Sequence, residues 1–372
     1  MSKKLVLTMI VKNEAAVIER CLASTLPAID TWCIVDTGST DGTQEKIKQF
    51  FENVGIEGQL HERPWVSFDV NRSQALELAR PLGDYSLMID ADEILEFDND
   101  FNPETFKEGL KADLYNVFSF YGGIKYHRPQ LTSNAKEFYY RGVLHEYVDC
   151  KEEIKTRDFC RGFINKPVQD GARSKDPAKY AKDAETFEKA LQGDVDPREF
   201  NRYHFYLAQS YRDSQQWDKD IEAYQKSADL GGWNEEVYYS LYQIGAIKEI
   251  LKKPIDEIIT HYLHASQVNP WRVEPYWAIA RVCRHCGRFD QAYIFAKKGL
   301  GMKYPEGALF LTAPVYEWCI QDEFAIASYW TGKFAESAKV SKKMLQDNKF
   351  PANQKQRIEA NYQFAMEAIL ES

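Results

Sequence analysis

The segment KLVLTMIVKNEAAVIERCLASTLPAIDTWCIVD, residues Lys4–Asp36, contains an apolar run, a helical pattern and a second apolar run, in that order. Residues 4–11 are apolar almost without interruption, which is typical of a strand buried on both faces. Residues 13–22 place their apolar side chains on one helical face, and Asn13 is predicted to cap that helix. Because parallel strands need a crossover connection, this order predicts a mostly parallel sheet covered by helices.

The same alternation continues to about residue 150 and predicts an α/β domain. The further elements that we expect are strands at residues 31–36, 59–61 and 85–90, a helix that carries Ile47, and a helix at 71–79. Polar residues end three of the strands, at 12–14, 36–37 and 90–92. In a parallel sheet such ends gather along the edge where ligands bind.

Beyond about residue 200 the pattern changes to pairs of helices. The segments QQWDKDI (215–221), GRFDQA (287–292) and TGKFAES (331–337) each place a turn residue two positions before an aromatic one. The helices that begin near residues 255 and 289 repeat with a spacing of about 34 residues, the tetratricopeptide (TPR) period. A single unit of this kind cannot bury its apolar face, so three or four units and a final polar helix predict one solenoid.

The two patterns divide the chain into three expected parts. They are an α/β domain at residues 1–165, a linker or lid loop with a connecting helix at 166–200, and a TPR-like helical domain with a C-terminal capping helix at 201–372. Charge divides in the same way, since the formal net charge of −9 lies entirely in residues 1–200 and the remainder is neutral.

Composition excludes several classes of protein. With 372 residues, 44% of them hydrophobic, the chain is long and apolar enough for two folded domains. It lacks the apolar stretch of a membrane span, and its seven cysteines are thinly spread, so a cytoplasmic location with reduced thiols is expected. Nucleic acid is not an expected partner, because no basic stripe is visible. Cys283 and Cys286 have the spacing of one ligand pair of a zinc site, but the sequence contains no suitably spaced second pair. We therefore assign these two cysteines to packing and a turn.

The motif MIDADEIL places Asp90 and Asp92 two positions apart at the end of a buried strand. Two carboxylates where the chain turns can both face a hard cation and leave positions open for diphosphate oxygens. The alternative is a solvated acidic turn. The strand–helix–strand context, with Asp36 ending an earlier strand, favours the cation site.

The segments TMIVKNEAAVIERCL, IVDTGSTDGT, NRSQALELA and LMIDADE, in this order, resemble the family 2 glycosyltransferases of the Rossmann-like GT-A fold. GARSKDPAKYAKDA and the helical half are similar to bacterial glycosyltransferases that carry a C-terminal TPR array. The resemblance implies a metal-dependent, inverting transfer of a sugar from a nucleotide diphosphate sugar, expected to be a UDP-sugar.

The resemblance also implies which residues bind the donor. Val11, Asn13 and Glu14 correspond to the start of the nucleobase pocket, and Asp36 corresponds to the acid that accepts a hydrogen bond from the uracil ring. The aromatic residue with which many relatives stack on the base is missing after the first strand, where this chain has Ile10–Asn13.

Asp90 and Asp92 correspond to the family's DxD pair. Asp90 is expected to reach the ribose or the metal, and Asp92 the Mn²⁺ or Mg²⁺ on the diphosphate. Arg72, on the preceding helix, is expected to face the donor, with a solvated helix charge as the alternative. Arg173 and Lys175 belong to a basic segment that folds over the diphosphate as a lid or solvates the linker.

An inverting transfer needs a base to take the proton of the acceptor. In RGVLHEYV, residues 141–148, His145 is expected as a third metal ligand and Glu146 as the base, and Glu93 is the rival base. On a continuous strand His145 and Glu146 would point to opposite faces, unless the strand ends or bulges there. The alternative for the two residues is a satisfied structural pair.

Two functions remain open at this point. The first is a glycosyltransferase whose acceptor is a protein, a peptide or a glycan, with a TPR domain that binds the acceptor or forms a homodimer. The second is a non-catalytic TPR scaffold with a degenerate sugar-nucleotide-binding domain.

Overall fold

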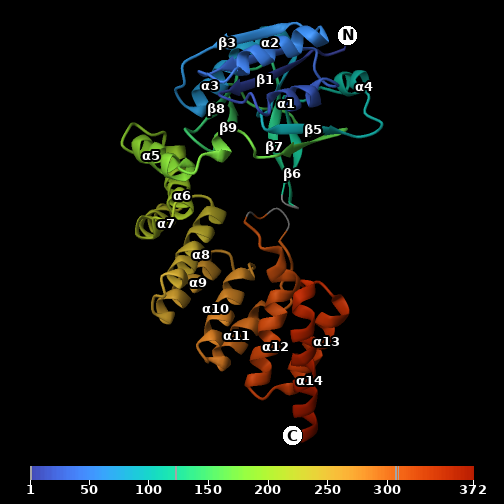
Figure 1. The fold of residues 1–372 in the computed structure, drawn as a ribbon. Coiled ribbons are helices and arrows are strands. Elements are labelled where there is room, and N and C mark those ends of the chain that lie inside the picture. Colours follow the sequence, from blue (N-terminus) through green and yellow to red (C-terminus); the bar gives the residue numbers. More distant parts are fainter. Residues whose placement is uncertain (1, 122–123, 306–307, 309) are drawn as a thin grey trace. The chain divides into compact units, whose positions relative to one another are not determined.

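The structure is a computed structural model that describes residues 2–121, 124–305, 308 and 310–372. The chain divides into two compact units, Met1–Gly193 and Asp194–Ser372 (Figure 1). The first unit combines a sheet with helices, and the second contains helices. This agrees with the predicted order of an α/β domain followed by a TPR-like helical domain.

The first unit contains the strands β1 (Leu5–Val11), β2 (Thr31–Asp36), β3 (Gly58–Glu62), β4 (Tyr85–Met88), β5 (Glu93–Phe97), β6 (Leu114–Tyr121), β7 (Ile124–Ser133), β8 (Phe138–Arg141), β9 (Tyr147–Cys150), β10 (Arg157–Phe159) and β11 (Phe163–Pro167). Its helices are α1 (Ile18–Thr25), α2 (Thr43–Val54), α3 (Phe68–Ala79), α4 (Pro103–Glu108) and α5 (Lys179–Leu191), with short 3-10 helices η1 (Arg80–Leu82) and η2 (Arg173–Lys175). The helix α5 therefore belongs to the first unit.

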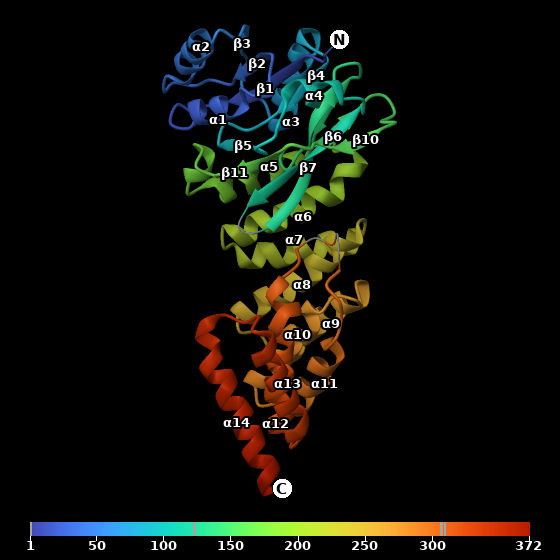
Figure 2. The same ribbon diagram turned by 90° about the vertical axis from the view of Figure 1, so that its right-hand side faces the viewer.

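The large sheet has the strand order β3-β2-β1-β4-β7-β6-β11-β5, and β10 pairs with β6. The first four strands run parallel, as predicted from the alternation of strands and helices. β7 is antiparallel to both β4 and β6, and the long β6 and β7 lie side by side (Figure 2). The sheet is therefore mixed, and a separate two-stranded sheet joins β8 to β9. From β6 to β11 the described residues form no helix, so the expected alternation up to about residue 150 was wrong beyond β6.

The register of the parallel strands brings their carboxyl ends together. Val11 at the end of β1 pairs with Asp36 at the end of β2, and Asp36 pairs with Glu62 at the end of β3. On the other side of β1, β4 ends at Met88, two residues before Asp90. The predicted gathering of polar strand ends along one edge is thus confirmed by the backbone register.

One local prediction was wrong, and one condition that the sequence left open is now decided. Asn13 does not cap the first helix, because α1 begins only at Ile18 and Asn13 has a left-handed backbone with a φ of 58°. Residues 141–148 are not one strand, because β8 ends at Arg141 and β9 begins at Tyr147. His145 lies in the turn between them with a φ of 53°, which ends the alternation that a continuous strand would impose.

The second unit contains the helices α6 (Pro197–Asp213), α7 (Trp217–Leu230), α8 (Asn234–Ile250), α9 (Ile255–Val268), α10 (Glu274–His285), α11 (Phe289–Gly299), α12 (Ile320–Trp330), α13 (Phe334–Asp347) and α14 (Lys355–Glu371), with η3 (Val315–Cys319) and η4 (Ala352–Gln354). Successive helices pack in pairs, as TPR units do. Gln215, Gly287 and Gly332 all have a positive φ in the turns before α7, α11 and α13, which explains the turn residue of the repeat. In the part of the chain that the structure describes, no helix is long and apolar enough to cross a membrane.

Candidate active site

Asp36, the last residue of β2, is buried with only 1% of its surface exposed. Its Oδ1 accepts hydrogen bonds from the backbone N–H groups of Gly38 and Ser39, both at 2.8 Å. Its Oδ2 is buried and accepts no hydrogen bond from any described residue. A buried carboxylate oxygen without a donor is costly, so this atom is available for a ligand N–H.

The loop after β1 holds the other residues predicted for the nucleobase pocket. Val11 is buried at the end of β1. The Oδ1 of Asn13 accepts a hydrogen bond from the backbone N–H of Thr40 at 2.8 Å, and this joins the loop after β1 to the loop after β2. Glu14 follows, and burial raises the pKa of its carboxyl to about 7, with a further increase from the carboxylate of Asp92.

Asp90 is held by two arginines. Arg72 Nη2 of α3 donates to Asp90 Oδ1 at 2.6 Å, and Arg72 Nε forms an ion pair with Glu146 Oε1 at 2.7 Å. Only 8% of Arg72 is exposed, so the alternative of a solvated helix charge is wrong. Burial opposes ionisation of Asp90, but Arg72 and Arg128 outweigh that effect and hold the pKa of Asp90 below its usual range.

Arg128 of β7 was not among the site residues predicted from the sequence. Its Nη2 donates to Glu93 Oε1, and Glu93 Oε2 accepts from the backbone N–H of Asp90 at 3.1 Å and from Asn165 Nδ2 at 2.9 Å. The rival base Glu93 is therefore buried, with protein donors on both of its oxygens. Only the pairing of β7 with β4 brings Arg128 here, and the sequence contains no local signal for that pairing.

The segment from Val168 to Ala172 contacts two of the acidic residues, Asp92 and Glu14, through its backbone. The backbone N–H of Gly171 donates to Asp92 Oδ2 at 3.3 Å, and that of Ala172 donates to Glu14 Oε2 at 3.2 Å. A Cβ atom at Gly171 would lie 3.0 Å from Asp92 Oδ2, so this close approach favours glycine. Burial raises the pKa of Asp92, and the nearby carboxylate of Asp90 raises it further.

The same segment is anchored on both sides. Arg20 of α1 binds Asp170 through two hydrogen bonds of 2.6 and 2.8 Å. Arg173 binds Asp183 of α5, and its guanidinium lies 4.7 Å from the centre of the Phe68 ring. Lys175 is exposed at the end of η2. The segment thus contacts the acidic residues directly in this structure, whereas a solvated linker would not.

Glu146 and His145 lie in the turn between β8 and β9. Glu146 is directed to Arg72 by their ion pair. The His145 ring is exposed and lies parallel to the Phe187 ring of α5, with 6.4 Å between the ring centres. Asp90, Asp92 and His145 remain the predicted metal ligands, although the described residues include no group of three His, Cys, Asp or Glu side chains arranged to hold a metal ion.

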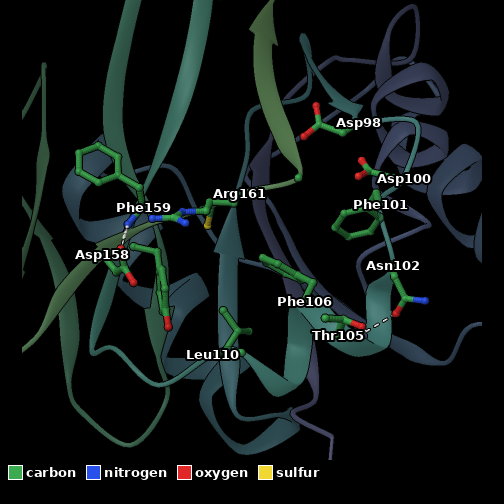
Figure 3. A pocket seen from close by; sticks show the side chains of 14 residues that line it. Asp98, Asp100, Phe101, Asn102, Thr105, Phe106, Leu110, Asp158, Phe159 and Arg161 are labelled. Carbon is green, nitrogen blue, oxygen red and sulfur yellow. Dashed lines mark hydrogen bonds between the residues drawn. The ribbon is translucent and has the colours of Figure 1, made fainter.

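A cavity of about 700 Å³ lies in a different part of the first unit (Figure 3). Phe101 and Phe106 lie on one side of it and Asp158 and Phe159 on the other, and Arg161 extends between them. None of the residues predicted for the active site lines this cavity. Asp98 and Asp100, two acids of the acid-rich stretch at residues 84–108, line this cavity, so the acids of that stretch do not form one cluster.

The comparison with protein families agrees with the first part of the chain. Residues 7–105 match the model of glycosyl transferase family 2. The match includes Asp36, Arg72, Asp90 and Asp92, so the family 2 resemblance of the first unit is confirmed. Glu146 and Arg128 lie beyond the matched residues.

Other known proteins match different extents of the chain. A TPR repeat-containing protein of Synechococcus elongatus is 31% identical over 148 residues, which are 38% of this chain and 35% of that protein. The chain therefore spans about a third of the length of the curated relative that it matches. The crystal structure of MamA is 19% identical and covers 46% of this chain and 90% of its own, with a TM-score of 0.37. A tetratricopeptide repeat protein from Parabacteroides merdae is 12% identical and covers 52% of this chain and 72% of its own, with a TM-score of 0.38.

Proposed function

We propose that the protein is an inverting glycosyltransferase that uses a nucleotide diphosphate sugar, with a UDP-sugar as the expected donor. One observation carries the proposal: Glu14, Asp36, Asp90 and Asp92 follow the carboxyl ends of adjacent parallel strands within the segment that matches family 2. Ligands of such sheets bind at this edge. The free Oδ2 of Asp36 suits a nucleobase N–H, which supports a uracil base.

The excess negative charge at the acidic residues favours a hard divalent cation, although the described side chains are not already arranged as a metal site. Glu14 and Asp92 are partly buried carboxylates whose pKa values are raised by burial and by neighbouring negative charge. A cation would relieve this repulsion, and carboxylate oxygens are the ligands that Mn²⁺ and Mg²⁺ prefer. Asp90 and Asp92, with His145, are the residues that would hold it. The cation would supply a Lewis acid for the charge that develops on the diphosphate.

The chain's own residues must also activate the acceptor. We assign the base to Glu146 in preference to Glu93, because Glu146 keeps some exposed surface while Glu93 is buried under Arg128 and Asn165. Glu146 takes the proton of the acceptor hydroxyl while the oxygen of that hydroxyl forms a bond to the anomeric carbon of the sugar. The bond from that carbon to the diphosphate breaks, and the nucleoside diphosphate leaves with the electron pair.

The backbone segment at Gly171 and Ala172 would exclude water from this reaction. It contacts Asp92 and Glu14, and water competes with the acceptor for the sugar.

We assign the helical unit to binding of a protein, peptide or glycan acceptor, or to formation of a homodimer. A non-catalytic scaffold is the second candidate, since the same two backbone N–H groups occupy carboxylates that a cation would need.

The test uses Asp92→Asn and Glu146→Gln in the full chain, with Asp100→Asn as the control. Asp100 belongs to the same acidic stretch but lines the separate cavity of Figure 3. Each site variant is expected to lower the rate of sugar transfer by roughly 100-fold or more, and the control by less than about twofold. Wild-type protein that binds a nucleoside diphosphate but transfers no sugar in a broad acceptor screen would favour the scaffold.

A further inference from the structure

Two guanidinium groups flank Asp90, and they differ in what they have left to bind. Arg72 is buried, its Nη2 donates to Asp90, and its Nε is ion-paired with Glu146 without the geometry of a hydrogen bond. Arg128 approaches Asp90 from β7, and 36% of its side chain is exposed. Arg128 is therefore the more accessible of the two cations beside the acidic pair.

The guanidinium of Arg128 is bound along one edge. Its Nη2 donates to Glu93, whereas its Nη1 lies 4.0 Å from Asp90 Oδ2, beyond hydrogen-bond distance. Its Nε is buried and donates to no side chain or backbone atom of the described ranges. Because a guanidinium has five N–H donors in a planar fork, this leaves donors for an anion.

The bound edge is rigidly supported. Glu93 is oriented by the backbone N–H of Asp90 and by Asn165, and Asn165 donates in turn to Gln130 Oε1 at 3.2 Å. Gln130 Nε2 donates to the backbone oxygen of Met88 at 3.1 Å, at the end of β4. These contacts join β4, β5, β7 and β11 around one arginine. A cation held in this way needs little reorganisation to bind a charged group.

We propose that Arg128 binds the diphosphate of the donor and stabilises the negative charge that develops on it as the nucleoside diphosphate leaves. The inference rests on the proposed function and adds to it a catalytic residue outside the family-matched segment. Arginine suits this role because its planar fork can bind two phosphate oxygens at once. Arg72 is then a positioning residue that orients Asp90 and Glu146.

Binding measurements separate a phosphate contact from a purely structural one. Isothermal titration compares UDP with uridine, and CDP, GDP and dTDP with their nucleosides, on wild type and on Arg128→Gln. The variant is expected to bind the preferred nucleoside diphosphate at least about tenfold more weakly and to bind the nucleoside unchanged. In transfer assays kcat is expected to fall by roughly 100-fold, more than KM rises. Arg161→Gln, in the separate cavity, is the matched control and is expected to match wild type.

A second variant protects the test against misfolding. Arg128→Gln leaves Glu93 buried without its cation, whereas Glu93→Gln/Arg128→Gln removes both charges and is expected to melt near the wild-type temperature. The double variant should bind the nucleoside diphosphate as weakly as Arg128→Gln does, and its affinity for the nucleoside should be unchanged. If it keeps wild-type discrimination between nucleoside diphosphate and nucleoside, Arg128 serves only to neutralise Glu93, and this inference is wrong while the proposed function stands. If wild type binds no nucleoside diphosphate, both are wrong.

Discussion

Each unit of the protein has an arginine buried between carboxylates, and the two surroundings differ. In the second unit Arg272 is fully buried and donates to Glu235 Oε2 at 2.8 Å and to Glu274 Oε1 at 2.9 Å. The ring of Tyr238 covers its guanidinium at 4.4 Å. In the first unit Arg72 holds Asp90 and Glu146, but the Asp90 side chain is 31% exposed.

The difference lies in how fully the acids around each arginine are hydrogen-bonded by groups of the protein. The partners of Arg272 form a closed network within the helical unit. Around Arg72 the acids continue to Asp92 and Glu14, whose pKa values are raised because burial and like charge are not fully offset. A closed network stabilises a fold, whereas an accessible edge with excess charge is typical of a binding site.

The largest expected effect is at Arg272. Arg272→Ala removes the cation from two nearly buried acids, so we expect the free energy of unfolding to fall by about 3–5 kcal/mol. Urea unfolding measures this. Arg198→Ala is the control, because Arg198 is mostly exposed in its pair with Asp196 and is expected to change stability by less than about 1 kcal/mol. Equal losses in both variants would contradict the closed network.

A smaller loss of stability is expected at Arg72. Arg72→Gln leaves Glu146 without its ion pair and Asp90 with only the more distant Arg128, but Asp90 reaches solvent, so we expect a loss of about 2 kcal/mol. Sugar transfer should fall far more steeply than stability, because both partners belong to the proposed active site. Unfolding curves and transfer rates on the same preparation test this. A variant with full transfer activity would remove Arg72 from the site.

Asp220 extends the comparison to a buried acid of the second unit without a bonded arginine. Both of its carboxylate oxygens lack a hydrogen-bond partner within the described chain, and burial, partly offset by Arg212, raises its pKa to about 8. Between about pH 4 and pH 8 the unfolded chain loses this proton and the folded chain keeps it, so stability falls as pH rises.

Asp220→Asn removes that penalty. We expect the variant to be more stable than wild type by about 2 kcal/mol at pH 8 and by much less at pH 5, with allowance for local relaxation. Thermal melting at pH 5, 6, 7 and 8 measures the trend, with Asp218→Asn, exposed on the same helix, as control. A constant difference across pH would show that Asp220 does not titrate in this range.

The smallest effect is expected at Cys286, which is exposed at the end of α10, while Cys283 is buried in the core. Cys286→Ser should change the free energy of unfolding by less than about 0.5 kcal/mol. Zinc titration of the wild type should show no binding that the variant lacks. Tight zinc binding lost in the variant would overturn the assignment of this pair to packing and a turn.

The amino-acid sequence alone predicts the order of the elements. Apolar runs of strand length alternate with helical periods up to residue 90, and a helix-pair repeat follows residue 200, because burial imposes a period of two or 3.6 residues on each element. It also placed Asp36, Asp90 and Asp92 at strand ends, since these positions follow directly from where the apolar runs stop.

The groups that surround those carboxylates depend on the three-dimensional packing of the chain. The pairing of β7 with β4 brings Arg128 to Asp90, and the turn at His145 directs Glu146 to Arg72. Both contacts join residues far apart in the chain. Long-range strand pairing depends on how all of the strands pack together, and no short stretch of sequence records it.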